Sequence, residues 1–403
     1  MIELAEARAR VMRSIAPLAP VEVAASDALG LVLAVDLVAG EAVPPFANTA
    51  MDGYAVRAAD TVGAPVTLRV VGELPAGRAP TVAVGEGQAI RIMTGAPVPP
   101  GADAIVMVER TERLGDDVVR IDVTATKGDH VRPAGGDIEA GQLVFTAGTI
   151  LRPAHLGVLA SLDVAEVSVF RRPRVGVLST GDELVARGPL APGQIRDSNR
   201  PMLLGLVAAA GCDGVDLGQA RDDEALITER IEHGLDACDV LLTSGAVSVG
   251  DYDFVKLAIE RLAAARGGEY VWSQVAIKPA KPLAFGVIGG VPVFGLPGNP
   301  VSSSVSFEVF ARPALRVLAG DPEPQRPVVE AIAATAFARR RDGKTHFDRA
   351  VVTIGPDGRY RCVRSGFQAS NVLSGMANAN ALAILADGDG VGEGEAVSVM
   401  LLT

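Results

Sequence analysis

Cysteine is scarce in this chain of 403 residues. Its three cysteines, Cys212, Cys238 and Cys362, lie far apart and form no CxxC pair. Neither a disulfide framework nor a structural zinc site is therefore indicated. Free thiols are typical of a reducing compartment, and we expect a cytoplasmic protein.

Positive charge and aromatic side chains are also limited. Lys and Arg number 37 against 48 Asp and Glu, which leaves a net charge of -11, and there are only 11 Phe, 4 Tyr and 1 Trp. This balance argues against nucleic acid or an anionic membrane surface as a partner. The acidic start, MIELAEARARVM, is unlike a signal peptide, and no apolar run reaches the roughly 18 residues of a membrane span.

Several well-known motifs are incomplete in this sequence. The GKT of residues 343–345 would need glycine at 338 for a P-loop, where Ala338 stands, and no GxGxxG follows a strand. Around Ser248, Ala246 replaces the first glycine of a nucleophile elbow, and the four histidines show no paired spacing. Serine hydrolase and zinc chemistry are both weakly supported.

The length predicts two to four domains. A helical pattern at Leu4, Ala7, Val11 and Ile15 precedes an apolar stretch, 29–38, that predicts a strand. Residues 41–145 are rich in Val, Thr, Gly and Pro, which predicts a β-rich domain without helices. Residues 148–170 return to a helix and a strand, which we expect to pair with the N-terminal segment, so that the β-rich part is an insertion.

From residue 174 onward, strands alternate with helices. Strands are predicted at 174–179, 214–218, 239–244 and 292–296, and helices at 201–210, 222–236, 254–265 and 301–318. This order predicts a doubly wound, mostly parallel sheet with its ligand at the carboxyl ends of the strands. A Pro-rich linker at about 319–327 then leads to a small β domain. We expect four domains: 1–40 with 141–170, 41–140, 171–320 and 321–403.

Three glycine-containing loops follow the strands of the doubly wound domain. Their sequences are STGDEL at 179–184, TSGAVSVGDYDF at 243–254 and GLPGNPVSSS at 295–304. Glycine lets the backbone approach a ligand, and helix N-termini favour anions, so the three together suit phosphate. The alternative is that such loops need glycine and capping residues in any case.

Carboxylates accompany these loops. Beside a phosphate they make sense if Mg²⁺ bridges the two, although helix capping is an alternative use for several of them. The residues are Asp182, Glu183, Asp222, Asp223, Asp251 and Asp253.

The segment VAIKPAKPLAF, 275–285, presents Lys278 and Lys281 on a backbone stiffened by prolines. Two ammonium groups on such a segment suit an oxyanion, and the alternative is a solvated edge strand. In the β-rich region, the sequences around Asp52, Thr94 and Asp137 are individually typical of turns.

Taken in order, NTAMDGYAV, RIMTGAPVPPGADAIVMVE, GGDI, GVLSTGDELV, GQIRDSN, TSGAVSVGDYDF, AIKPAKP and GLPGNPVSSSVSFE resemble the molybdopterin molybdenumtransferases, the MoeA and gephyrin E-domain family. The resemblance covers nearly the whole chain. It implies an elongated homodimer that inserts molybdate into adenylylated molybdopterin and releases AMP in a Mg²⁺-dependent step. It also implies a molybdopterin adenylyltransferase as the upstream partner.

The resemblance also implies which residues act. The catalytic set comprises Asp52, Thr94, Asp137, Glu183, Asp222 and Asp253, of which Asp52, Glu183 and Asp253 would hold the metal. The substrate-binding set comprises Lys278, Lys281, Pro297, Gly298, Asn299, Pro300, Ser244, Gly245, Ser370 and Arg349. Because Asp52, Thr94 and Asp137 precede the doubly wound domain, we expect a composite cleft, which in a dimer could include the partner chain.

The chain departs from the family pattern at four places. Ser273 and Gln274 stand near where a basic residue is common, Ala246 and Ala280 replace glycines, and Lys344 replaces an arginine. We expect reduced affinity or altered oxyanion choice from these changes. Three alternatives remain: an adenylyltransferase-like relative sharing only the doubly wound domain, a molybdopterin-binding scaffold without catalysis, and a tungstate-selective enzyme.

Overall fold

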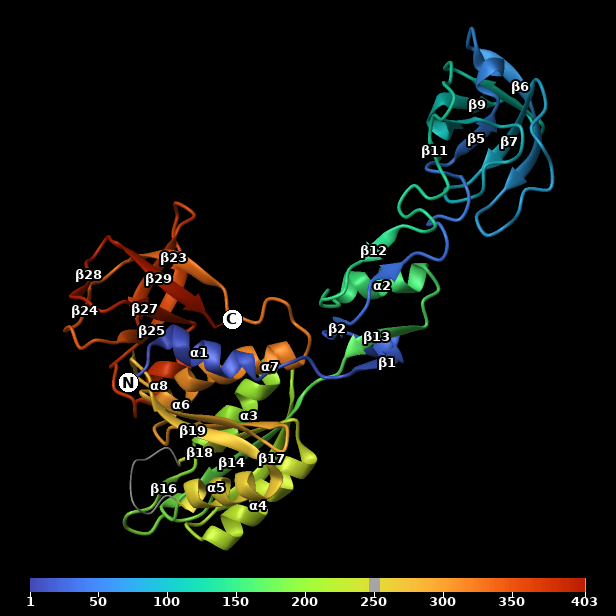
Figure 1. Ribbon diagram of the computed structural model, residues 1–403. Helices are drawn as coiled ribbons and strands as arrows, with labels where there is room; N and C mark the ends of the chain where they lie inside the picture. Colours follow the sequence, from blue (N-terminus) through green and yellow to red (C-terminus); the bar gives the residue numbers. More distant parts are fainter. Residues whose placement is uncertain (246–253, 403) are drawn as a thin grey trace. The chain divides into compact units, whose positions relative to one another are not determined.

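The computed structural model describes residues 1–245 and 254–402, which fall into two compact units (Figure 1). The first unit contains Met1–Glu22, Gly30–Ala34 and the chain from Ser168 onward, and the second contains Val23–Leu29 and Val35–Val167. In the described residues, no helix has both the length and the apolar character needed to cross a membrane.

The first unit is built on a six-stranded sheet. Its order is β17 (Asp213–Ala220), β14 (Arg174–Thr180), β18 (Val240–Ser244), β22 (Val291–Leu296), β21 (Pro282–Ile288) and β19 (Gly268–Gln274). The first four strands are mutually parallel, β21 runs antiparallel to β22, and β19 runs antiparallel to β21. The predicted mostly parallel sheet is confirmed, while β19 and β21 extend it beyond the strands that the sequence indicated.

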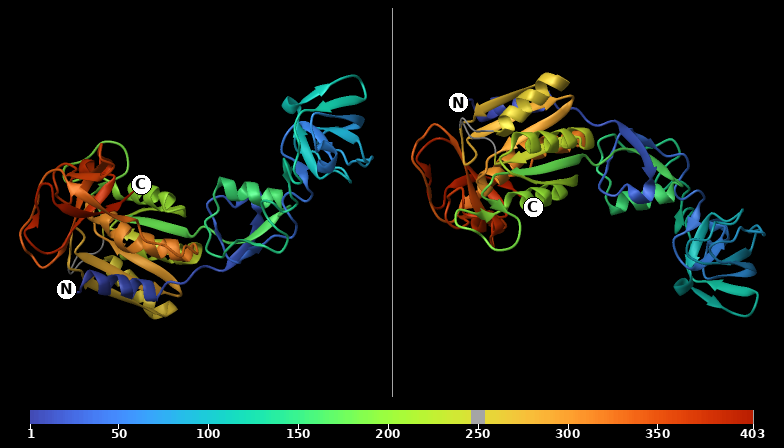
Figure 2. Two further views of the ribbon diagram at one scale, coloured as in Figure 1. Left: turned by 90° about the horizontal axis from the view of Figure 1, so that it is seen from above. Right: turned by 90° about the horizontal axis from the view of Figure 1, so that it is seen from below.

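Helices cover both faces of this sheet (Figures 1 and 2). On one face, α4 (Glu224–Ala237) and α5 (Phe254–Arg266) pack through Ile227, Ile231 and Ile259. The other face carries α3 (Asn199–Ala209), α6 (Pro300–Ser306), η4 (Phe307–Ala311) and α7 (Arg312–Leu318). The predicted helix 301–318 is therefore three consecutive helical segments.

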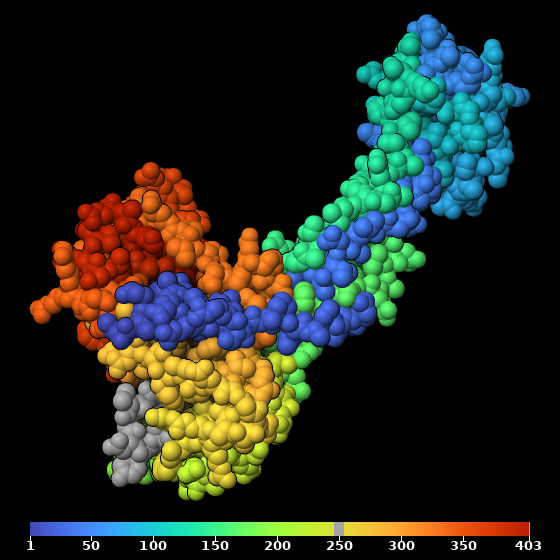
Figure 3. All heavy atoms as spheres, in the orientation of Figure 1, coloured from blue at the N-terminus to red at the C-terminus, as the bar shows by residue number. Residues whose placement is uncertain are grey.

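Helix α1 (Leu4–Arg13) joins the core of the first unit, although we expected it to pair with residues 148–170. Ala7 and Val11 are 1% exposed and belong to one apolar cluster with Leu283 and Phe310. Figure 3 shows this helix lying along the surface of that unit, next to β19 and β21. The strands after it do pair as expected, in a sheet of order β1 (Pro20–Ala24), β13 (Glu166–Phe170) and β2 (Val32–Leu33).

The C-terminal part of the first unit is a closed β structure, as the sequence predicted for a small β domain. Its six-stranded sheet has the order β20 (Ile277–Lys278), β25 (Thr345–Ile354), β26 (Tyr360–Arg364), β23 (Val328–Ala333), β29 (Ala396–Leu401) and β27 (Ala381–Leu385). An additional pairing of β25 with β27 closes it. A small pair, β24 (Phe337–Ala338) and β28 (Gly390–Val391), and the short α8 (Leu373–Ala377) complete this part.

The second unit contains the predicted β-rich region. Its main sheet has the order β8 (Ala104–Met107), β5 (Gly53–Val56), β7 (Gln88–Ile92), β6 (Val66–Leu74), β10 (Val118–Ile121) and β9 (Thr111–Arg113). Two further pairs are β11 (Val131–Arg132) with β4 (Asn48–Thr49) and β12 (Leu143–Phe145) with β3 (Leu37–Val38). Between residues 41 and 145, all of them described, the only helices are the short 3-10 turns η2 (Ala58–Thr61) and η3 (Val108–Arg110).

The remaining elements of this unit are η1 (Ala25–Asp27) and α2 (Pro153–Ser161). The single strand predicted over 29–38 is wrong, because the chain changes sheets within that stretch: β2 pairs with β13, whereas β3 pairs with β12. The division into four domains stays a prediction.

Candidate functional site

Three loops begin at the carboxyl edge of the parallel strands in the first unit. Strands β14, β18 and β22 are neighbours, so their carboxyl ends lie together. Gly245, with φ +114°, lies against the first loop: a Cβ there would come within 2.5 Å of the carbonyl oxygen of Thr180. A glycine is required at this close approach.

One asparagine ties the loops together. The side-chain Nδ2 of Asn199, at the start of α3, donates to Ser244 Oγ and to the carbonyl of Gly298, both at 2.7 Å. Asn199 is 8% exposed, and its Oδ1 is buried without a hydrogen-bond partner in the described part of the chain. These bonds join Ser244, at the end of β18, and Gly298, in the third loop, to the start of α3.

A cavity of about 540 Å³ opens beside this junction. Its lining includes Glu183, Arg196, Asp197, Asn199, Ser244 and Gly298. Arg196 comes from the short pair β15 (Leu184–Val185) and β16 (Ile195–Arg196). Asp197 is held by Ser179 Oγ at 3.1 Å and by Arg200 Nε at 3.0 Å. The predicted residues Glu183, Ser244, Gly245, Gly298, Asn299 and Pro300 all line this cavity.

A second cavity of about 730 Å³ collects three lysines. Lys278, Lys281 and Lys344 line it together with Pro297, Asn299 and Ser370, and none of its described lining residues is acidic. Asn299 lines both cavities. Three ammonium groups without a carboxylate on the same wall suit a small oxyanion.

A tight turn presents Lys278 and Lys281. Strand β20 pairs in parallel with β25, which places Lys278 opposite His346, and the N–H of Val275 donates to the carbonyl of Lys281 at 2.7 Å. Between the lysines, the Lys278–Pro279 peptide is cis and Ala280 has φ +72°. The segment is therefore a folded loop attached to the C-terminal β structure.

The departures from the family pattern fall at distinct places. Ala280 occupies a left-handed backbone conformation that glycine adopts without strain. Ser273 lines a separate cavity next to α1, and neither Ser273 nor Gln274 lines the lysine cavity. Lys344 does line it. Ala246 lies outside the described residues.

Arg349 binds the backbone of a loop that lines the lysine cavity. Its side chain is fully buried and lines neither of the two cavities. Its Nη2 donates to the carbonyl of Phe367 at 2.5 Å, and burial lowers the pKa of its guanidinium. The carbonyl of Ser370 accepts from the N–H of Val301 at 3.1 Å, which joins this loop to the start of α6.

The second unit holds the other predicted residues. Asp52 Oδ1 accepts hydrogen bonds from the backbone N–H and the hydroxyl of Thr94, and these bonds lower the pKa of the Asp52 carboxyl. The backbone N–H of Asp137 donates to the carbonyl of Val43 at 3.0 Å. The composite cleft that would unite these residues with Glu183 stays a prediction.

The remaining acids are dispersed. The backbone N–H of Asp222 donates to Asp182 Oδ1 at 3.2 Å, and neither residue lines the 540 Å³ cavity that contains Glu183. Asp253 and Asp251 lie outside the described residues. Across residues 1–245 and 254–402, no three His, Cys, Asp or Glu side chains form a ready metal site. Mg²⁺ commonly uses one or two carboxylates plus substrate phosphates and waters. The two acids of the first cavity, Glu183 and the Arg200-paired Asp197, are compatible with it.

Two residues of the first cavity, Asp197 and Asn199, were not predicted to act. Both lie in GQIRDSN, a motif that contributed to the family resemblance. An asparagine at a helix start is most often a cap, so only the neighbouring loops reveal its other contacts.

Three family models match successive parts of the chain. The MoeA N-terminal region (domain I and II) matches residues 2–162, a probable molybdopterin binding domain matches residues 176–317, and the MoeA C-terminal region (domain IV) matches residues 330–402.

Similar proteins cover most of the same length. The chain is 46% identical over 340 residues to molybdopterin molybdenumtransferase 2 of Mycobacterium tuberculosis, covering 83% of each protein. It is 36% identical over 376 residues to molybdopterin molybdenumtransferase of Haemophilus influenzae, covering 93% of this chain and 92% of that protein. The crystal structure of the molybdopterin biosynthesis MoeA protein from Pyrococcus horikoshii OT3 matches with a TM-score of 0.83 and 30% identity, over 100% of both chains.

Proposed function

The chain belongs to the MoeA family and is a molybdopterin molybdenumtransferase of molybdenum cofactor biosynthesis, and from this premise we propose that it inserts molybdate into adenylylated molybdopterin with release of AMP. We assign molybdate and the adenylylated pterin to two separate cavities because these cavities are neighbours that share Asn299.

The lysine cavity is the proposed molybdate site. Lys278, Lys281 and Lys344 offer three cationic groups on one wall, in a protein whose net charge of -11 would otherwise repel an anion. The cavity that contains Glu183 lies at the helix-bearing loops, where backbone N–H groups suit the phosphates of the adenylylated pterin. Asn299, on both walls, would lie between the oxyanion and the pterin.

Mg²⁺ is the proposed cofactor. It would neutralise the pyrophosphate of the adenylylated pterin, with Glu183 as a ligand and with Asp52 and Asp253 as further candidates. The chain's own contribution is to hold the two anions together, through the lysines for the oxyanion and the loop fixed by Asn199 for the pterin. Catalysis would then consist mainly of positioning and charge stabilisation.

We also propose a homodimer in the cytoplasm, supplied by a molybdopterin adenylyltransferase upstream. The three cysteines are free and buried, which fits a reducing compartment. An adenylyltransferase-like relative sharing only the doubly wound domain is disfavoured, because the family models match on both sides of that domain. A scaffold that binds without turnover and a tungstate-selective enzyme are the remaining alternatives.

The test is AMP release from adenylylated molybdopterin by the purified protein with Mg²⁺ and either molybdate or tungstate. We expect molybdate-dependent AMP release in the wild type, and a loss of at least tenfold in Glu183→Gln. The matched control is Glu229→Gln, which removes the same charge from an exposed position on α4 that lines neither cavity. Full activity of Glu183→Gln would refute the role of Glu183. Binding of adenylylated molybdopterin by the wild type without AMP release would favour the scaffold. AMP release with tungstate alone would favour the tungstate-selective enzyme.

A further inference from the structure

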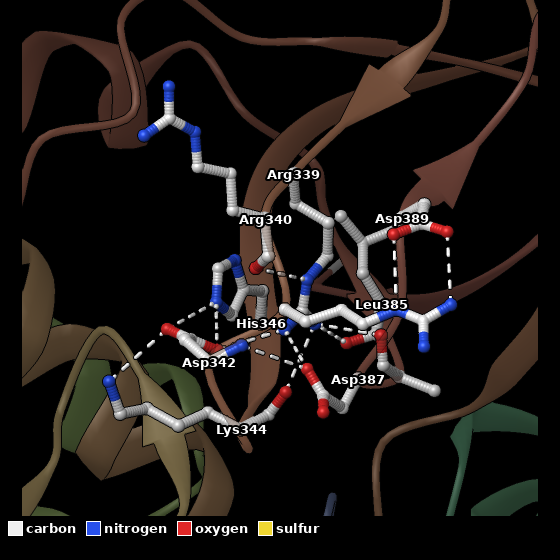
Figure 4. A network of polar contacts seen from close by, with 10 residues as sticks. Arg339, Arg340, Asp342, Lys344, His346, Leu385, Asp387 and Asp389 are labelled. Carbon is white, nitrogen blue, oxygen red and sulfur yellow. Dashed lines mark hydrogen bonds and ion pairs between the residues drawn. The ribbon is translucent and has the colours of Figure 1, made fainter.

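We propose that Asp342 is an internal counter-anion of the lysine cavity, which weakens and tunes its affinity for a doubly charged oxyanion by neutralising Lys344. This inference rests on the proposed placement of molybdate in that cavity. Figure 4 shows Asp342 in contact with Lys344 and His346, within a polar network of the C-terminal β structure.

The three lysines of the cavity are not equivalent. Asp342 Oδ2 lies 3.2 Å from the Nζ of Lys344, yet Asp342 itself is not part of the cavity wall. Lys278 and Lys281 form no ion pair with any carboxylate of the described chain. One of the three cations is therefore already paired when the oxyanion arrives.

A second set of contacts fixes the Asp342 carboxylate. Arg339, whose side chain is 2% exposed, donates through Nη2 to Asp342 Oδ1 at 2.9 Å and to Asp387 Oδ1 at 2.8 Å. The Asp387 oxygen also accepts from the backbone N–H of Asp342 at 3.1 Å. Arg339 therefore holds the Asp342 carboxylate and Asp387 holds its backbone, so that rotation of the carboxylate away from Lys344 would break the bond to Arg339.

Asp342 also carries its negative charge at neutral pH. Its carboxyl is partly desolvated, which raises its pKa, but the contacts with His346 and Lys344 outweigh this and lower the pKa below its ordinary value. His346 Nε2 lies 3.1 Å from Oδ1 and 3.2 Å from Oδ2. The other charged groups facing His346 are Arg339 and Lys278.

Two effects of Asp342 on oxyanion binding have opposite signs. As a positioning group it would hold Lys344 toward the cavity and strengthen binding, whereas as a fixed negative charge it repels the oxyanion. The Lys344–Asp342 pair is partly exposed, with side chains 23% and 29% accessible, and such pairs orient a flexible lysine only weakly. Charge repulsion acts over a longer range than this contact, and it is twice as large for a dianion as for a monoanion. The repulsive effect should therefore dominate.

The experiment is calorimetric titration of molybdate into the full-length protein at low salt. We expect Asp342→Asn to bind molybdate roughly three- to tenfold more tightly than the wild type, the size that Coulomb's law gives for one removed charge several ångströms from a dianion in a watery site. The gain should shrink at high ionic strength, where such charges are screened.

The matched control is Asp389→Asn in the same network. Asp389 is exposed, pairs with Arg341 at 3.0 Å and lines neither cavity, so removing its charge should leave affinity within about twofold. Asp342→Ser serves as a second variant without the amide, and thermal unfolding shows whether each variant is folded.

Lys278→Ala separates this inference from the proposed function. If Lys278→Ala weakens molybdate binding while Asp342→Asn and Asp342→Ser bind no more tightly than the wild type, the counter-anion role is overturned and the proposed function stands. Weaker binding in both Asp342 variants would show a positioning role instead. If Lys278→Ala binds molybdate as the wild type does, the oxyanion lies elsewhere, and both the placement and this inference fail.

Discussion

Asp52 Oδ1 accepts two hydrogen bonds from Thr94, one from its backbone N–H and one from its hydroxyl, each 2.7 Å long. The two residues are 42 positions apart in the sequence, Asp52 just before β5 and Thr94 shortly after β7. The backbone bond is the largest cause of the lowered pKa of Asp52, the hydroxyl bond is the next, and Arg91 adds a smaller effect. Thr94 thus keeps a candidate metal ligand ionised.

Thr94→Val should raise the pKa of Asp52 only part of the way to its ordinary value. The substitution removes the hydroxyl bond but keeps the backbone bond, which is the larger cause of the lowered pKa. An NMR titration of the Asp52 carboxyl measures this directly. Thr94→Ser is the control, since it keeps the hydroxyl, and an unchanged pKa in Thr94→Val would contradict the role of this bond.

The same pKa gives a direction to the pH dependence of stability. Because the pKa is lower in the folded protein, Asp52 contributes stability above its unfolded pKa of about 3.9, and this contribution is lost as the pH falls through the folded value. The difference in the free energy of unfolding between the wild type and Thr94→Val should therefore become smaller as the pH drops from 5 to about 3. A constant difference over that range would argue against the linkage.

The sequence predicted the elements of the doubly wound sheet well, because their apolar runs and the intervening helix patterns are local signals. The strand predicted at 292–296 is β22, and the helix predicted at 222–236 is α4. Lys278 and Lys281 could likewise be singled out from their spacing with prolines. Lys344 is recognisable from the sequence only as a departure from the family pattern, since nothing in its local sequence shows that it shares a cavity with Lys278 and Lys281.

Contacts between distant loops could not be predicted. The Arg339–Asp342–Asp387 network depends on two loops of the C-terminal β structure meeting, and residues 342 and 387 are 45 positions apart. Arg349 was expected to bind substrate, but no single-sequence pattern shows that its side chain is fully buried. The strand predicted at 29–38 failed because strand pairing, not apolarity alone, decides where a strand ends.

Asn199→Ala should destabilise the first unit by about 1–3 kcal/mol, since it leaves Ser244 Oγ and the carbonyl of Gly298 without their shared donor. Asn199→Asp should be worse, because a carboxylate cannot donate to that carbonyl. Urea unfolding of the wild type and the two variants measures the order of their stabilities. The control is Asn378→Ala, at an exposed position away from both cavities, and equal midpoints for the alanine and aspartate variants would contradict the donor role.

Ala280 has a left-handed backbone conformation, with φ +72°, between the two lysines. A left-handed alanine costs about 1–2 kcal/mol. Replacing it by glycine relieves that cost but loses a buried methyl worth about 0.8 kcal/mol and adds chain entropy of about 0.5–1 kcal/mol. Ala280→Gly should therefore change the free energy of unfolding by less than about 1 kcal/mol, the remainder of these terms.

Ala280→Val should behave differently. A β-branched residue is strongly disfavoured at positive φ, and Ala280 is only 3% exposed, so the larger side chain would also overpack the core. We expect Ala280→Val to lose more than about 2 kcal/mol and to weaken molybdate binding, because the turn that presents Lys278 and Lys281 must shift. Calorimetric unfolding and molybdate titration of both variants test this, and a valine variant as stable as the glycine variant would show that the turn tolerates a different backbone.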